Sequence, residues 1–179
     1  MYRLFVGVPL PEDVRMRLEG LCGGVPGARW VPAENFHITL RFIGDVPGDM
    51  AEEIGYALAQ VRPKRFDIEL SGVGHFSSGQ EVRVLWAGVR KSPELLALHE
   101  RIDSVARKLE LPDDQRRFIP HVTLAKLRDP NLPKVQEWLA VNALFRAGPI
   151  TVDHFVLYSS YRQSSGSIYT PEAEYMLAA

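Results

Sequence analysis

The sequence predicts an α+β fold in which two similar lobes each carry the same motif on a strand. The motif is His-x-Thr-Leu with a β-branched residue at x, and it occurs at His37–Leu40 and at His121–Leu124. With only 5 His in 179 residues, the chain's own composition gives on the order of 0.01 expected occurrences. Each copy lies in a predicted strand between two segments of helical period. A diverged internal duplication, divided near Gly88–Pro93, explains this arrangement.

The first half alternates between apolar strands and amphipathic helices. Pro11 is suited to the start of a helix, which has Val14 and Leu18 on one face and ends at Gly23-Gly24. In chain order we expect a strand over 2–8, this helix, an extended segment over 28–31, the motif strand over 36–43, a helix over 50–61, a strand over 66–73, a loop over 77–80 and a strand over 82–89.

The second half repeats this order. Ser92 is a plausible N-cap followed by Pro93, and Asn131 is a second cap residue. We expect a helix over 93–109, a break over 111–114, the motif strand over 119–127, a helix from Asn131, a strand over 150–159, a loop over 164–167 and a closing strand over 168–177.

Composition restricts the class of protein. The length fits a single domain spanning 1–179 with two lobes. The net charge of −1 argues against coating of nucleic acid through bulk charge. Cys22 is the only cysteine, which excludes a disulfide framework and suits the reducing cytoplasm. No stretch approaches the ~20 apolar residues that span a membrane, and nothing requires an oligomer, so we expect a monomer.

The motif places two functional groups on one face of each strand. Side chains alternate across a strand, so His37 and Thr39 share one face while Ile38 and Leu40 share the other. His121 and Thr123 are related in the same way. Two such strands brought side by side would surround one cleft with two imidazole–hydroxyl pairs.

This arrangement suits phosphodiester hydrolysis. Histidine titrates near neutral pH, so one imidazole can be neutral and accept a proton from water while the other is protonated and donates to the departing oxygen. The threonine hydroxyls can donate hydrogen bonds to the phosphoryl oxygens, where charge accumulates. A zinc site is the main alternative, but neither motif has the His-x-His or His-x-x-x-His spacing of such sites. We therefore expect neither metal nor cofactor.

The residues around the motifs resemble one family. Arg29–Gly44, containing Trp30-Val31-Pro32 before the motif, and Phe118–Lys126 are similar to the two signatures of the RNA 2',3'-cyclic phosphodiesterases. These enzymes are also called 2'-5' RNA ligases and belong to the two-histidine phosphoesterases. The segment Val84–Val89 and the C-terminal Leu157-Tyr158-Ser159 also resemble the family, so the similarity covers essentially the whole chain.

The resemblance implies a bilobal α+β fold with pseudo-two-fold duplicated lobes, antiparallel sheets lining a central cleft and helices outside. It implies opening of an RNA 2',3'-cyclic phosphate to a 2'-phosphate without metal, with 2'-5' ligation as the reverse reaction. His37 then corresponds to the proton donor and His121 to the proton acceptor, with Thr39 and Thr123 as phosphate ligands. The sequence by itself leaves the direction open, because the lobes are pseudo-symmetric.

Further substrate-binding candidates lie near the motifs. The family commonly has Arg where this chain has Lys126, which keeps the charge but loses the bidentate fork. Strict alternation puts Lys126 opposite to His121 unless the strand bulges, and puts Arg41 on the His37 face as a competing phosphate ligand. Candidates for stacking on a base are Phe42, Phe76, Trp86 and Phe118, and Arg116-Arg117 could attract phosphates.

Three functions stay open at this point. The first is hydrolysis of RNA ends, with tRNA fragments among the conceivable substrates. The second is hydrolysis of small cyclic nucleotides. The third is a non-catalytic module that binds RNA ends, against which the two intact His–Thr pairs argue, because binding alone needs no titratable groups.

Overall fold

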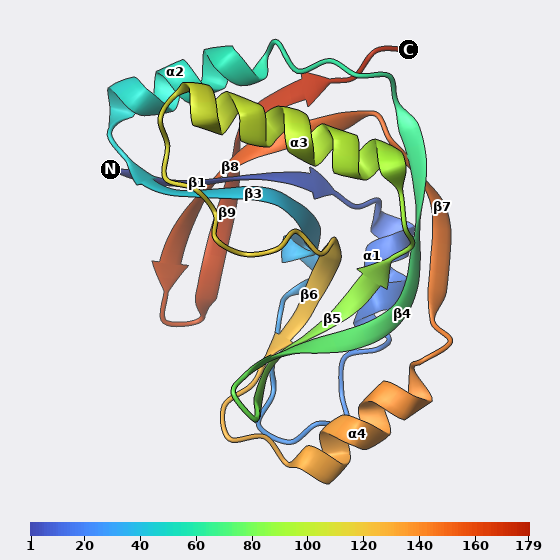
Figure 1. The fold of residues 1–179 in the computed structure, drawn as a ribbon. Coiled ribbons are helices and arrows are strands. Elements are labelled where there is room, and N and C mark those ends of the chain that lie inside the picture. Colours follow the sequence, from blue (N-terminus) through green and yellow to red (C-terminus); the bar gives the residue numbers. More distant parts are fainter.

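The computed structural model describes all 179 residues and has four α-helices on a large antiparallel sheet (Figure 1). The expected α+β class is confirmed. The helices are α1 (Glu12–Glu19), α2 (Gly48–Leu58), α3 (Pro93–Lys108) and α4 (Leu132–Val141), and a 3-10 turn spans Ala33–Asn35. The strands are β1 (Tyr2–Pro9), β2 (Arg29–Trp30), β3 (His37–Val46), β4 (Phe66–Ser78), β5 (Glu81–Val89), β6 (His121–Lys126), β7 (Arg146–Val152), β8 (His154–Gln163) and β9 (Gly166–Met176).

The sheet consists of two groups of four strands joined at the motif strands. Its order is β7-β4-β5-β6-β3-β1-β8-β9, with β2 paired to β6. The only pairing between β3 and β6 is Ile38 with Val122. The groups can therefore diverge on either side of this junction, and both motifs lie at it.

The two groups do not correspond to the two halves of the chain. One contains β1, β3, β8 and β9, so it is built from both ends of the chain, and the other contains β4 to β7. The predicted boundary at Gly88–Pro93 is wrong, because β5 and β6 on either side of it are hydrogen-bonded neighbours. Pseudo-symmetry is retained in the order β1-α1-β3-α2 against β5-α3-β6-α4.

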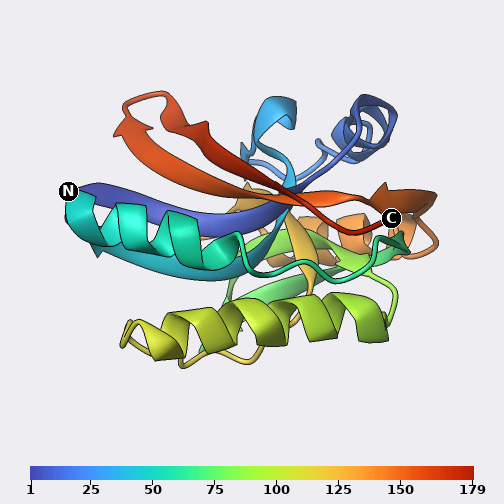
Figure 2. The same ribbon diagram turned by 90° about the horizontal axis from the view of Figure 1, so that it is seen from above.

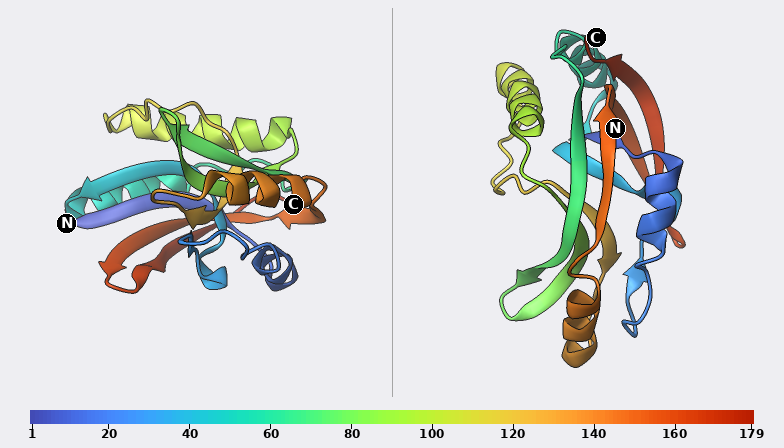
Figure 3. Two further views of the ribbon diagram at one scale, coloured as in Figure 1. Left: turned by 90° about the horizontal axis from the view of Figure 1, so that it is seen from below. Right: turned by 90° about the vertical axis from the view of Figure 1, so that its right-hand side faces the viewer.

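The helices pack across the junction between the groups. α3 follows β5 of one group but contacts β3 and α2 of the other. Conversely, α1 follows β1 and contacts β7, and the indole of Trp138 on α4 donates to the carbonyl of Leu21 just after α1. Figure 2 and the right panel of Figure 3 show α1 and α3 on opposite sides of the molecule with strands between them. This exchange ties the two groups together.

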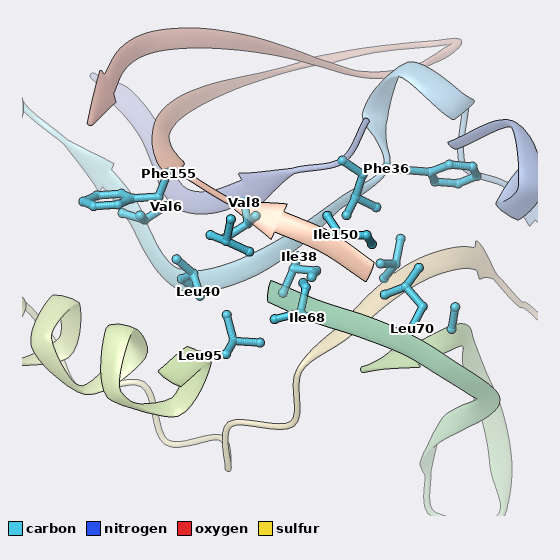
Figure 4. Packing of buried hydrophobic residues seen from close by; sticks show 14 of the residues in the cluster. Val6, Val8, Phe36, Ile38, Leu40, Ile68, Leu70, Leu95, Ile150 and Phe155 are labelled. Atoms are coloured by element: carbon cyan, nitrogen blue, oxygen red, sulfur yellow. The ribbon is translucent and has the colours of Figure 1, made fainter. Parts of the chain in front are cut away.

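A single hydrophobic core runs through both strand groups. One continuous cluster of 35 buried apolar residues includes Ile38 and Leu40 of β3, Ile68 of β4 and Leu95 of α3 (Figure 4). Of the predicted apolar stripe of α3, Leu95, Leu98 and Ile102 are buried, and Ala106 is buried beside them. The apolar face of each motif strand is thus fixed in the core, which leaves the other face for the cleft.

Local signals predicted most elements correctly. The hydroxyl of Ser92 accepts from the amide of Leu95, and the side chain of Asn131 accepts from the amide of Lys134, so both predicted N-caps are confirmed. The single strand predicted over 150–159 is wrong: β7 ends at Val152 and β8 begins at His154, on different strand groups. The chain crosses between groups at Asp153 without a glycine or proline to mark it. No helix is both long and apolar enough to cross a membrane.

Candidate active site

The two motifs meet at the junction of the strand groups. Ile38 and Val122 pair in antiparallel fashion and are fully buried. Their neighbours in each motif, the histidines and threonines, are half-buried and point to the opposite face. Because the register is antiparallel, continuing it places each histidine beside the threonine of the other motif. The expected gathering of two His–Thr pairs thus follows from one backbone pairing.

Each motif strand has a β-bulge at its leucine. In β3, Thr39 pairs with Gly7 and Arg41 with Val6, so Leu40 has no partner on β1. In β6, Thr123 pairs with Trp86 and Ala125 with Leu85, which leaves Leu124 unpaired in the same way. Two successive residues after each threonine are consequently buried: Leu40 and Arg41, and Leu124 and Ala125. Beyond each bulge, alternation is shifted by one residue.

The carbonyl at each bulge finds a partner outside the ladder. The Leu40 carbonyl accepts a hydrogen bond of 2.8 Å from Nδ1 of His99 on α3. The Leu124 carbonyl accepts one of 2.8 Å from the amide of Val31, beside β2. A hydrogen bond from outside the ladder therefore stabilises each bulge. Because a carbonyl can only accept, His99 carries its proton on Nδ1.

The bulge in β3 removes Arg41 from the cleft. The prediction that Arg41 lies on the His37 face is wrong, because the residue is 3% exposed and its guanidinium reaches Asp103 on α3. Its guanidinium donates to Asp103 at 3.0 Å and to the carbonyls of Phe42 at 2.6 Å and Pro112 at 2.8 Å. Arg41 is an anchor between β3, α3 and the loop before β6.

The bulges bring the fifth residue after each histidine back to the cleft face. These residues are Phe42 and Lys126, and both line one cavity of about 140 Å³ together with His37 and Thr39. The condition under which Lys126 could reach the cleft, a bulge in its strand, is thus met. Strict alternation fails here for the same physical reason that removes Arg41.

Backbone carbonyls orient both imidazoles. Nδ1 of His37 donates to the carbonyl of Asn35 at 2.7 Å, and Nδ1 of His121 donates to that of Ile119 at 2.6 Å. Each Nε2 is therefore the nitrogen available for proton transfer. Nε2 of His37 lies 2.9 Å from the hydroxyl of Thr39. In the neutral state the hydroxyl donates to Nε2, and in the protonated state Nε2–H donates to the hydroxyl.

Burial keeps both histidines from protonating at their usual pH. Desolvation lowers the pKa of His37; the carbonyl of Asn35 opposes this, and the charge of His121 lowers it further. Desolvation also lowers the pKa of His121, opposed by the carbonyl of Ile119 and assisted by Arg116. The two imidazoles are close enough for charge on one to disfavour charge on the other. The state in which only one of the two imidazoles is protonated is thus favoured over the state in which both are.

Aromatic rings surround each imidazole. His37 lies 4.9 Å from the ring of Phe5 and 5.4 Å, edge to face, from Tyr169, with Tyr158 at 6.0 Å. None of the three was predicted as a site residue, because the pairing of Phe5 with Tyr158 joins strands from opposite ends of the chain. They desolvate His37 and form one wall of its setting.

The second imidazole has a different aromatic setting. His121 lies 4.8 Å, edge to face, from Phe76 and 6.1 Å from Trp86. The two predicted candidates Phe76 and Trp86 therefore do lie beside the motif. Phe118 does not line the cavity; its ring stacks on His99 at 3.8 Å between centroids. Arg116 is exposed and paired with Asp114.

The cavity is strongly cationic. Its lining comprises Arg3, Phe5, His37, Thr39, Phe42, Lys126, Ser160, Arg162, Ser167 and Tyr169, with no carboxylate. Arg3 and Arg162 were not predicted as site residues, because both lie far along the chain from the motifs. Across the structure, no group of three or more His, Cys, Asp and Glu side chains is arranged to hold a metal ion. A site of this charge suits an anionic ligand.

Two relatives found by sequence comparison share one enzyme name. The chain is 38% identical over 148 residues to the RNA 2',3'-cyclic phosphodiesterase of Aeropyrum pernix, covering 82% of this chain and 84% of the relative. It is 31% identical over 170 residues to the enzyme of that name from Archaeoglobus fulgidus, covering 93% and 96%.

Solved structures agree over the full length. E. coli LigT complexed with 3'-AMP matches with a TM-score of 0.80 at 25% identity, covering 99% of both chains. TT0787 of Thermus thermophilus matches with a TM-score of 0.78 at 25% identity, covering 98% of this chain and 97% of the other. The model of the 2'-5' RNA ligase superfamily matches residues 11–164. With the family model, the sequence relatives and the solved structures in agreement, the chain belongs to the 2'-5' RNA ligase superfamily of two-histidine phosphoesterases.

Proposed function

We propose that this protein hydrolyses the 2',3'-cyclic phosphate at RNA ends to a 2'-phosphomonoester. The observation that carries the proposal is the pair of imidazoles at one junction, each with Nδ1 bonded to a backbone carbonyl and Nε2 left for proton transfer, beside a cavity lined by Lys126 and no carboxylate. The names of the sequence relatives support the substrate class.

The reaction needs one acid and one base. His121 accepts a proton from water, whose oxygen forms the new bond to phosphorus. His37 donates a proton to O3' as the P–O3' bond breaks, which leaves the phosphate on O2'. The charge coupling between the two imidazoles favours this state of opposite protonation. Microscopic reversibility makes 2'-5' ligation the reverse reaction, with the roles exchanged.

Protonation of His37 also changes the hydrogen bond that the Thr39 hydroxyl can donate. When Nε2 is protonated it donates to the Thr39 hydroxyl, whose own hydrogen is then free for a phosphoryl oxygen. Thr123 has the corresponding position in the second motif, and Lys126 adds a positive charge. These donors stabilise the charge that develops on the phosphoryl oxygens. Two imidazoles supply both proton transfers, so no metal is required in this scheme.

Product analysis tests the proposal. An RNA ending in a 2',3'-cyclic phosphate is incubated with the protein in excess chelator, and the end group is identified. A 2'-phosphate is expected. A 3'-phosphate would reverse the leaving-group assignment, loss of activity on chelation would refute the metal-free scheme, and an unchanged substrate with and without added divalent ions would refute the function.

A further inference from the structure

Beyond the two motifs, the cavity contains cations without acidic partners. Arg3 on β1 and Arg162 on β8 line it together with Lys126. None of the three takes part in any ion pair of the protein. Three neighbouring cations without a carboxylate repel one another. Its charge exceeds that of one phosphodiester, and an anionic ligand with a second negative group would relieve the repulsion.

The lining is ordered along the cleft. Phe5 of β1 pairs with Phe42 and with Tyr158, next to His37. Two residues further along the same face of β1 lies Arg3, whose guanidinium carbon is 5.4 Å from the centre of the Phe42 ring. With increasing distance from the motif, the cavity wall is thus formed first by an imidazole and a hydroxyl, then by aromatic rings, and then by a cation.

The β8–β9 hairpin extends the same surface. Ser160 pairs with Tyr169, which packs edge-on against His37, and Arg162 pairs with Ser167. The hairpin is held to the motif by Asn35, whose backbone carbonyl accepts from His37 and whose side chain donates to the carbonyl of Ser167 at 2.9 Å. The distal cationic end is therefore fixed relative to the catalytic end.

We infer that Arg3 and Arg162 form a subsite for a second phosphate, the one on the 5' oxygen of the nucleotide that carries the cyclic phosphate. In an RNA chain this is the first internucleotide phosphodiester. With the cyclic phosphate at His37 and Thr39, the ribose and base lie against the aromatic part and the 5' phosphate reaches the guanidinium groups. The inference rests on the proposed function and adds a preference for polynucleotide ends over free nucleoside cyclic phosphates.

A matched substrate pair tests this inference. Uridine 2',3'-cyclic phosphate and its 5'-phosphorylated form differ by one phosphate. We expect the 5' phosphate to raise kcat/KM about tenfold or more, as charge-assisted contacts to arginine do. This ratio should fall about tenfold in Arg162→Gln and in Arg3→Gln, and Arg162→Lys should restore part of it. Arg62→Gln, an exposed arginine outside the cavity and without an ion pair, is the control with the same charge change.

The outcomes separate the two hypotheses. Equal kcat/KM values for the two substrates in the wild type, or a ratio unaffected by both glutamine variants with unchanged melting temperatures, would overturn the subsite while the hydrolytic function stands. Failure to hydrolyse either substrate or cyclic-ended RNA refutes the proposed function instead. The dinucleotide ApU with a 2',3'-cyclic end carries a diester at this position. It should keep the preference, and a preference restricted to the 5' monoester would contradict the assignment to RNA chains.

Discussion

The two motif strands share their backbone and differ in the side chains beyond the motif. Both strands bulge at the leucine, and in both a carbonyl two residues earlier orients the imidazole. In both, a donor outside the sheet ladder binds the carbonyl of the bulged leucine. Beyond the bulge, β3 continues with Arg41 and Phe42, and β6 with Ala125 and Lys126. One strand thus contributes an anchor and an aromatic ring, and the other contributes packing and a cation. The two motifs share their geometry, and the different residues at two positions after the leucine give each motif its own surroundings.

The strands that flank the motifs differ in a complementary way. Opposite Thr39 stands Gly7, where an added Cβ would lie 3.2 Å from the imidazole of His37 and 3.4 Å from the ring of Tyr158. Opposite Thr123 stands Trp86, whose ring lies over Gly74 so closely that a Cβ there would be 2.3 Å away. In both strand groups a glycine makes room for an aromatic ring. In the first group the glycine is on β1, the strand paired with the motif strand, and the ring is on β8. In the second group the ring is on β5, the strand paired with the motif strand, and the glycine is on β4. The imidazoles are consequently desolvated by different walls.

Removal of either imidazole should have the largest effect. We expect His37→Ala and His121→Ala each to lower kcat by about 10³-fold, the range for general acid–base catalysis, with little change in melting temperature. An aryl phosphodiester with a good leaving group needs no proton donor, so His37→Ala should recover more of the wild-type rate on it than His121→Ala. Greater recovery by His121→Ala would exchange the two roles.

The threonines should come next in size of effect. Thr39→Val and Thr123→Val remove a donor to the phosphoryl oxygens, for which a loss in kcat of about 10²-fold is expected, and Thr→Ser variants should retain most activity. Because the hydroxyl of Thr39 is bonded to Nε2 of His37, Thr39→Val should also shift the pH profile. A Thr39 variant with a reduced rate but an unshifted profile would separate the hydroxyl from the imidazole.

The pH dependence sharpens the comparison of the imidazoles. Catalysis needs His121 neutral, above its pKa, and His37 protonated, below its pKa. Both pKa values are lowered by burial, below the usual value of about 6.5. The profile of kcat/KM should therefore be bell-shaped with its maximum below pH about 6.5, falling tenfold per unit above it as His37 loses its proton. Bound phosphate raises the pKa of both imidazoles, so kcat should peak at higher pH. A maximum of kcat/KM at pH about 7.5 or above would contradict this assignment.

The residues after the bulges should give the smallest and most divergent effects. Lys126→Met should raise KM about tenfold and leave the free energy of unfolding within about 0.5 kcal/mol. Arg41→Met leaves the carbonyls of Phe42 and Pro112 without their donors, which should lower the free energy of unfolding by about 2 kcal/mol. Urea denaturation and steady-state kinetics measure both. A stable Arg41→Met protein with a raised KM would return Arg41 to substrate binding.

Much of the fold could be predicted because its signals are local. Cap residues such as Ser92 and Asn131 act within one turn, and the stripe that includes Leu95 has the period of a helix. The division into lobes could not be predicted, because the pairing of β1 with β8 joins residues from opposite ends of the chain. The turn at Asp153 was missed because no glycine or proline marks it.

The candidate site divides in the same manner. The sequence by itself determined which four motif side chains lie on the face opposite the core, since His37, Thr39, His121 and Thr123 precede the bulges and obey simple alternation. Only the tertiary structure decided where the residues after each threonine lie. A bulge exists when a partner strand offers one residue for two, and it needs a donor such as His99 or the amide of Val31 for the exposed carbonyl. That long-range condition moved Arg41 into the interior, and brought Phe42 and Lys126 to the cavity where Arg3 and Arg162 from distant strands meet them.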